Sequence, residues 1–283
     1  MATSHRDHLG RPVVAVTGLG VVTSLGKGKD DNWDALTAGQ SGIREIKRFE
    51  TEGLRTRIAG TVDFIDDRPE TAADLSYALA ELAAGEAIGE AGLPHGRFPG
   101  PLFMAIPPVE MEWQQRLALD AAGAEDEDGY GRLFSGLKAR NWSWPYNRFV
   151  FAGVAERTAE TFGTQGAPIS LSTACASGAT AIQLGVEAIR RGDCEVALCI
   201  GTDGSINTET LIRFSLLSAL STKNDPPEQA IKPFSRNRDG FIMAEGSGAL
   251  VIESLDHALA RGAEVLAIIA GIGERADDFH RTR

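Results

Sequence analysis

The sequence has only three cysteines, Cys175, Cys194 and Cys199, with no C-x-x-C pair and no histidine at metal-ligand spacing from them. This scarcity indicates neither a disulfide framework nor a metal site, and nothing suggests a bound cofactor. No apolar run is long enough to span a bilayer. The apolar residues 13–22 follow a stretch of mixed charge, which favours a strand over a signal peptide, so we expect a cytoplasmic protein.

Basic residues are also scarce, with 28 Lys and Arg against 39 Asp and Glu and a formal net charge of −11. A chain of that sign does not favour nucleic acid or an anionic membrane as its main partner.

The chain does contain much glycine, with 32 residues, and its apolar strand-like runs alternate with helix-like stretches. This alternation predicts an α/β layered fold with parallel strands. For a helix near residues 32–42 we expect Asn32 or Asp31 as cap, and for a helix from 71 to 92 we expect Thr71. Residues 109–150 are the least regular, and their acidic run AEDEDG is interpreted as a solvated loop. Further elements are expected at these ranges: 12–22, 100–106, 151–162, 168–174, 176–191, 194–201, 246–254, 255–262 and 264–273.

Two segments, VVAVTGLG at 13–20 and LAIIAGIG at 266–273, share an apolar run that ends in G-x-G. Glycine-ended strands are common in α/β proteins, so the match can be coincidence. Alternatively, a second copy of the first half begins near residue 265, and the 283 residues hold an incomplete catalyst.

Cys175 stands in the stretch PISLSTACASGATAIQLGVEAIRRGD, where a strand-like run becomes a helix-like one. The N-terminus of a helix offers unpaired N–H groups and favours an anion, and that environment favours a thiolate. The surrounding alanine, serine and glycine residues leave room for a substrate, although they also permit tight helix–strand packing. We interpret Cys175 as a nucleophile, and Cys194 and Cys199, which lie in an apolar strand, as inert core.

Histidine is the usual proton-handling partner of a nucleophilic cysteine, and no clear partner emerges here. Of the five histidines only His280 follows a predicted strand end; the others are His5, His8, His95 and His257. The chain also lacks a G-x-S-x-G motif and a P-loop.

Five motifs occur in one order: VAVTGLGVVTSLG (14–26), STACASG (172–178), ALSTKND (219–225), PFSRNRDGFIMAEGSGALVIE (233–253) and DDFH (277–280). Together they resemble the elongating β-ketoacyl-acyl-carrier-protein synthases of the type II class. The resemblance implies the thiolase fold, in which two similar α/β halves stack as α-β-α-β-α layers, with residues 1–255 as the first half and 256–283 as the start of the second. It also implies a homodimer, and we expect the strand at 194–200 to pair across its two-fold axis.

The resemblance further implies a reaction of fatty acid biosynthesis. An acyl chain passes from the phosphopantetheine of an acyl carrier protein to Cys175, whose own N–H donates to the oxyanion, and then condenses with decarboxylated malonyl-carrier protein. By the same resemblance Phe214 lines the acyl pocket, and Asp277 and His280 give structural support. Arg238, Asp239 and Glu245 would form a buried ionic scaffold.

The chain departs from the family in two places. The family's two catalytic histidines and its second oxyanion donor fall beyond residue 283, so residues 1–283 alone are expected not to elongate a chain. At 106–113 the chain has IPPVEMEW in place of a glycine-rich turn, which changes the shape expected for the acyl pocket.

Two other functions remain open from the sequence. A non-catalytic partner subunit that shapes an acyl pocket would normally lack the cysteine, and a coenzyme-A-dependent thiolase would carry it much nearer the N-terminus. For an acidic carrier protein we expect a docking patch of basic residues: Arg44, Lys47, Arg48, Arg55 and Arg57.

Overall fold

The computed structural model describes residues 4–65, 71–139 and 148–276, and within them one mixed sheet has the strand order β2-β1-β8-β7-β5-β6, with β9 also paired to β1. Strands β7, β5 and β6 are parallel, whereas β8 runs antiparallel to both β7 and β1. The strands span Val14–Thr23 (β1), Gly26–Lys27 (β2), Leu102–Ala105 (β5), Ile169–Leu171 (β6), Val196–Asp203 (β7), Gly246–Ser254 (β8) and Ala267–Ile268 (β9).

The expectation of parallel pairing is therefore wrong for β8 and β1. Residue 203 at the end of β7 pairs with residue 246 at the start of β8, so the connection between them stays at one end of the sheet. A connection that returns at the same end produces an antiparallel neighbour, whereas a parallel neighbour needs a crossover.

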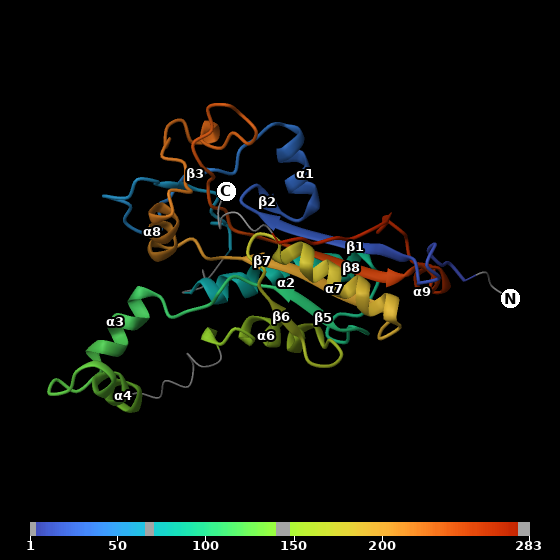
Figure 1. Ribbon diagram of the computed structural model, residues 1–283, viewed down its shortest axis with the longest axis horizontal. Helices are drawn as coiled ribbons and strands as arrows, with labels where there is room; N and C mark the ends of the chain where they lie inside the picture. Colours follow the sequence, from blue (N-terminus) through green and yellow to red (C-terminus); the bar gives the residue numbers. More distant parts are fainter. Residues whose placement is uncertain (1–3, 66–70, 140–147, 277–283) are drawn as a thin grey trace.

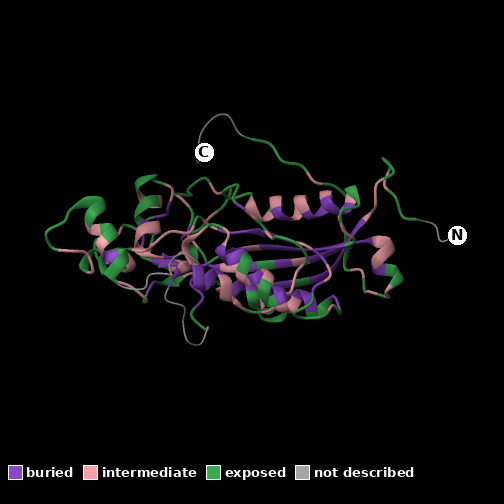
Figure 2. Ribbon diagram, turned by 90° about the horizontal axis from the view of Figure 1, so that it is seen from below, coloured by how far each residue is buried: buried purple, intermediate pink, exposed green. Residues whose placement is uncertain are grey.

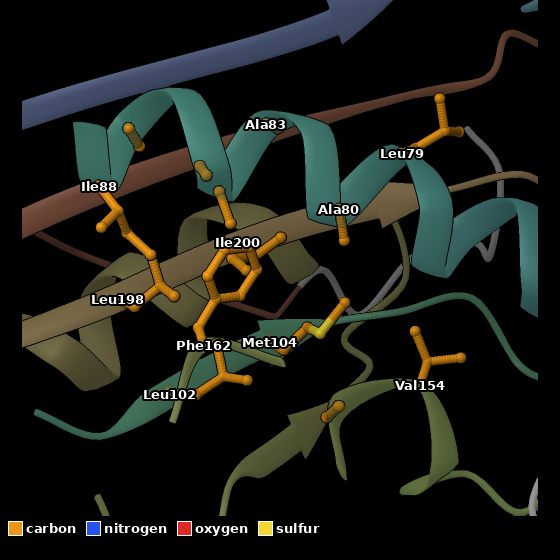
Figure 3. Close-up of a cluster of buried hydrophobic side chains, with 14 of the residues drawn as sticks. Leu79, Ala80, Ala83, Ile88, Leu102, Met104, Val154, Phe162, Leu198 and Ile200 are labelled. Atoms are coloured by element: carbon orange, nitrogen blue, oxygen red, sulfur yellow. The ribbon is translucent and has the colours of Figure 1, made fainter. Parts of the chain in front are cut away.

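Helices cover both faces of the sheet (Figure 1). On one face lies α2 (Ala72–Glu90), with α6 (Gly153–Phe162) packed beside it; on the other lies α7 (Ser177–Arg191). Figure 2 shows the buried strands between these layers. The larger core joins α2 and α6 to the inner strands, with the side chains of Leu79, Met104 and Ile200 among those that meet there (Figure 3).

The remaining helices lie at the ends of the sheet or outside it. They are α1 (Lys29–Thr37), α3 (Trp113–Ala121), α4 (Gly129–Ala139), α8 (Thr208–Leu216), α9 (Leu255–Ala260) and a 3₁₀ turn at Pro227–Gln229. A small separate sheet pairs β3 (Arg44–Glu45) with β4 (Ile58–Ala59). Among the described residues no helix is both long and apolar enough to cross a membrane.

The two glycines of the G-x-G in β1 are explained by close contact with α2. A Cβ atom on Gly18 would lie 2.0 Å from the carbonyl oxygen of Ala87, and one on Gly20 would lie 1.9 Å from that of Ala83. Any side chain there would push α2 off the sheet. The corresponding Gly271 and Gly273 would meet nothing within 4 Å. The internal repeat, and the division at residue 255 with it, therefore stays a prediction.

The expected helix caps are correct for one helix and wrong for another. Thr71 does cap α2, since its side chain accepts a hydrogen bond from the Asp74 N–H. The expected caps of the first helix are wrong, because α1 begins at Lys29 after Gly28, and Asn32 lies buried within the helix, where it bonds the carbonyls of Gly26 and Gly28. The strand expected at 264–273 shrinks to the two residues of β9.

Residues 109–150 contain more structure than the sequence indicated. The acidic run 124–129 is an exposed connection, as expected, but it joins two helices, α3 and α4, that were not predicted. Residues 140–147 lie outside the described part of the chain.

Candidate active site

Cys175 lies on the turn that connects β6 to α7, at the end of the sheet where β5 and β7 also finish. Residues 172–176 are all exposed. Ala174, the residue before the cysteine, has φ +52°, a left-handed conformation that is uncommon for a residue with a Cβ atom. Such strain persists only where the surroundings impose it, and it is typical of functional turns.

Ser177 fixes this turn from the first residue of α7. Its hydroxyl donates to the carbonyl of Ala174 at 2.6 Å and accepts from the N–H of Thr173 at 2.8 Å. The helix N-cap is Ala176, and no side-chain hydrogen bond caps it. Cys175 thus stands one residue before a helix N-cap that has no side-chain hydrogen bond, as the sequence predicted within one position.

The small residues of this stretch serve packing as well as access. The Cα of Gly178 on α7 lies 3.3 Å from where a Cβ on Gly201 of β7 would be, and a Cβ on Gly185 would lie 2.5 Å from the sulfur of Cys199. These glycines let α7 approach the sheet closely. The residues next to the sulfur, Ala174 and Ala176, are instead exposed. The glycines therefore serve tight helix–strand packing, and the exposed alanines leave space beside Cys175.

The three thiols differ in environment in the expected direction. Cys175 is exposed, Cys194 is partly buried, and Cys199 is buried with 2% of its surface accessible. Burial raises the pKa of the Cys194 thiol to about 11, with neighbouring carboxylates adding to the effect, and burial also raises the pKa of Cys199.

Brief iodoacetamide treatment near neutral pH is therefore expected to label Cys175 first. A thiol with a raised pKa stays protonated and unreactive below that value, so labelling of Cys194 should grow only as the pH rises toward 11. Peptide mass mapping over a pH series would show this order. Labelling of Cys194 ahead of Cys175 near neutral pH would contradict the assignment.

Three of the described histidines contact groups away from Cys175, and His8 lies beside Arg190 at the far end of α7. His5 contacts Asp256 at 2.7 Å, and His257 contacts Glu253 at 2.6 Å. Glu253 pairs with the start of β7, whereas Cys175 follows the end of β6, so these groups mark opposite ends of the sheet. His95 precedes β5 at that same far end and faces Phe162 with ring centroids 6.3 Å apart. Asp277 and His280 lie outside the described residues.

Phe214 is on α8, which follows β7 at the Cys175 end of the sheet. Its ring meets that of Phe241 edge-on at 5.5 Å, and it packs on a small core that includes Ile206 and Leu211. Its role as a wall of the acyl pocket remains a prediction.

The expected ionic scaffold is correct for Glu245 but wrong for Arg238 and Asp239, which are exposed. Glu245 has 2% of its surface accessible and accepts from Arg48 at 2.5 and 2.6 Å and from the N–H of Val62 at 2.9 Å. Asp239 instead accepts from the hydroxyl of Ser221 at 2.8 Å.

A group of glutamates and arginines was not expected from the sequence. Glu110 accepts from Arg213 at 2.9 Å and from Arg116 at 2.8 Å, and the Arg213 hydrogen bond holds the pKa of the Glu110 carboxyl below its usual value. Arg116 and Arg213 border an open cavity of about 820 Å³ between α2, α3 and α8, which neither Cys175 nor Phe214 lines. The glutamates of IPPVEMEW could have indicated an ionic group here. The sequence pattern could not show the partner, because Arg213 lies 103 residues after Glu110.

Solved structures with a similar fold define the class of protein. A ketosynthase of a type II polyketide synthase, in complex with its acyl-carrier protein and bound to a hexaketide, superposes with a TM-score of 0.77 at 29% identity, covering 92% of this chain and 62% of that one. A β-ketoacyl synthase from Burkholderia phymatum gives 0.76 at 27% identity, covering 96% and 66%. The fold is thus the thiolase-like fold of ketosynthases, as expected.

Residues 11–258 match the family described as beta-ketoacyl synthase, N-terminal domain, and the chain belongs to that family. It is 33% identical to the tetracenomycin polyketide synthase ketoacyl synthase alpha subunit of Streptomyces glaucescens and 29% identical to 3-oxoacyl-[acyl-carrier-protein] synthase 2 of Vibrio cholerae. Each alignment covers 95% of this chain and 64% of the relative, so the chain spans less than two thirds of their length.

Proposed function

We propose that this chain carries the nucleophile of a ketosynthase that loads an acyl chain from a carrier protein onto Cys175. The exposed position of Cys175 on the strained turn before α7 carries the proposal. Its thiolate attacks the carrier thioester, the phosphopantetheine thiol leaves, and a new thioester forms on the cysteine. The N–H of Cys175 is proposed to donate to the oxyanion of this step.

In the second proposed stage, malonyl-carrier protein loses carbon dioxide and its carbanion attacks the Cys175 thioester. A carbon–carbon bond forms, the Cys175 thiolate leaves, and the product on the carrier is two carbons longer. His5, His95 and His257 contact groups at the other end of the sheet, and His8 lies beside Arg190 at the far end of α7, so we propose that none of these four histidines stabilises the intermediate enolate.

The nature of the acyl chain has two candidates. A fatty acyl chain follows from the motifs and from relatives such as the Vibrio cholerae enzyme at 29% identity. A polyketide chain is the second candidate, because the tetracenomycin polyketide synthase subunit is 33% identical. A non-catalytic partner subunit is disfavoured because Cys175 is retained and accessible.

The test is acyl transfer to residues 1–283 from carrier protein loaded with either saturated or β-keto chains, followed by intact mass and peptide mapping. An acyl adduct on Cys175 is expected, absent from Cys175→Ala and retained in Cys194→Ala. An adduct that survives Cys175→Ala would reject the proposal. The ratio of the two chain types in the adduct would separate the two candidates.

The docking patch proposed for the acidic carrier protein loses one of its members. Arg48 has a side chain only 6% exposed and is held by Glu245, so it cannot meet a partner. Arg44 is bound to the carbonyl of Ser24 at 2.6 Å and keeps part of its surface. The exposed positions are therefore Arg44, Lys47, Arg55 and Arg57.

Charge reversal at Lys47 and Arg55 is expected to weaken carrier binding and to flatten its dependence on salt, because exposed charges act through screened, long-range attraction. Affinity measured at low and at physiological ionic strength would show both effects. Arg191→Glu, at the far end of α7, is the matched control. Equal salt dependence of carrier binding in the charge-reversed variant and the parent chain would show that this patch is not the docking site.

We also propose a homodimer, but through a different strand from the one expected. β7 is hydrogen-bonded to β8 on one side and to β5 on the other, so it cannot pair across a two-fold axis. Both faces of β7 are apolar because helices cover them. Apolar faces give no information about whether the hydrogen-bonding edges of a strand are free. β6 is paired on one side only among the described residues, and an unpaired edge can add a second copy.

Sedimentation at micromolar concentration should give twice the chain mass of 30.1 kDa. Ile169→Pro on β6 should shift the chain toward monomer because it disrupts that edge. Ile268→Pro on β9 is a matched control, since Ile169 and Ile268 are 44% and 46% exposed. Equal dissociation by the two variants would reject β6 as the interface.

A further inference from the structure

Helices α3 and α4, with the loop between them, form an arm (residues 113–139) that projects from the body of the protein (Figure 1). The two helices pack on each other around Leu119, but much of their apolar surface stays exposed (Figure 2). Trp113, Leu117 and Phe134 are 60%, 51% and 59% exposed. Apolar burial therefore contributes little to holding the arm against the body.

Polar contacts at the base of the arm join it to the body. Glu110 binds Arg213 of α8 through both carboxylate oxygens, and Glu209 of α8 accepts from the N–H of Trp113. Glu112 accepts from the N–H of Ala72 at the start of α2, at 2.5 Å. We call the contacts of Glu110 and Trp113 with α8 the clasp. A carboxylate held in the fork of an arginine is geometrically specific as well as attractive.

The clasp acts on one face of α8, and the residue next to Arg213 is Phe214. Phe214 points to the other side, where it meets Phe241 and the small core around Leu211. Ile212 is 42% exposed and Leu216 is 80% exposed, so only part of this short helix is buried. The position of α8 thus depends on a small apolar contact on one side and on the clasp on the other.

We infer that Arg213 and Glu110 are positioning residues that fix α8, and through it Phe214, and thereby set which acyl chain lengths Cys175 accepts. This inference rests on the proposed function, because it needs an acyl chain beside Phe214. It also gives a role to the segment IPPVEMEW, which differs from the glycine-rich turn of the family. Its first glutamate, Glu110, binds the arm to α8, the helix that carries Phe214. Release of the clasp lets α8 move and widens the range of chains accepted.

The experiment compares Arg213→Gln with Arg116→Gln. Both remove one partner of Glu110 at similar exposure, 52% and 45% of the side chain, but Arg116 belongs to the arm and does not reach α8. Arg213→Lys keeps the charge and loses the fork. The first measurement is hydrogen exchange of the amides of residues 208–216, and the second is the chain-length distribution of the adduct on Cys175 from an equimolar mixture of acyl-carrier proteins.

Arg213→Gln is expected to raise exchange in α8 and to lower the preference between short and long chains about two- to fivefold, the scale of one exposed charged pair. Arg213→Lys should recover part of both effects, and Arg116→Gln should change neither. If Arg213→Gln and Arg116→Gln behave alike in both measurements, the inference is wrong. If the parent chain forms no adduct at all, the proposed function fails and the chain-length role with it, while hydrogen exchange still decides whether the clasp holds α8.

Discussion

Residues 1–283, given acyl- and malonyl-carrier protein, are expected to become acylated on Cys175 and to release no elongated product. Acylation needs a thiolate and an oxyanion donor, the roles proposed above for the exposed Cys175 and its own N–H on the turn before α7. Condensation also needs donors to the enolate, and the loss of one such donor costs about a hundredfold to a thousandfold in rate. The resemblance assigns this role to two histidines beyond residue 283, and three of the four described histidines, His5, His95 and His257, contact groups at the other end of the sheet.

The measurement is product formation by mass spectrometry, with a full-length relative such as the Vibrio cholerae enzyme assayed in parallel. The relative should elongate under conditions in which residues 1–283 only acylate. Robust turnover by residues 1–283 would contradict the expectation and show that other groups stabilise the enolate. His280→Ala would then be the first variant to examine.

Glu245→Gln is expected to lower the free energy of unfolding by up to about 3–5 kcal/mol, because it leaves the buried Arg48 charge with only the half-exposed Asp63, at 3.1 Å, as its carboxylate partner. Arg48 and Glu245 have side chains only 6% and 0% exposed, and the pair joins the segment after β3 to the start of β8. Urea unfolding with an unchanged slope would measure the loss.

Two further variants make this result specific. Glu187→Gln, which removes an exposed pair with Arg191 on α7, should change the free energy by less than about 1 kcal/mol. Replacing Arg48 and Glu245 together by methionine should cost less than Glu245→Gln alone, since no buried charge remains and Asp63, which also pairs with Arg48, is 45% exposed to solvent. A loss of under about 1 kcal/mol for Glu245→Gln would show that the buried pair contributes little.

Arg48 shows why a sequence pattern can wrongly predict that a residue lies on the surface. Arg48 stands among basic residues with few acids nearby, which is typical of an exposed patch. Its partner is 197 residues away in the sequence, and only the fold brings that carboxylate to it. The same applies to Glu110 and Arg213, 103 residues apart.

The sequence by itself determined the features that depend on a few neighbouring residues. The change of period at Cys175 placed the cysteine between β6 and α7, and Thr71 marked the start of α2. The family's motifs, which are local patterns too, led to the correct fold.

The tertiary structure alone decided which strands meet and which charges are buried. Apolar residues show that β7 is covered, but only its hydrogen bonds to β5 and β8 show that it has no free edge. The antiparallel direction of β8 follows from the path of the long connection after β7. The burial of Arg48 and the clasp between the arm and α8 depend on contacts between residues 197 and 103 positions apart. Side-chain periodicity repeats within one helix or strand, so it carries no information about partners at that distance.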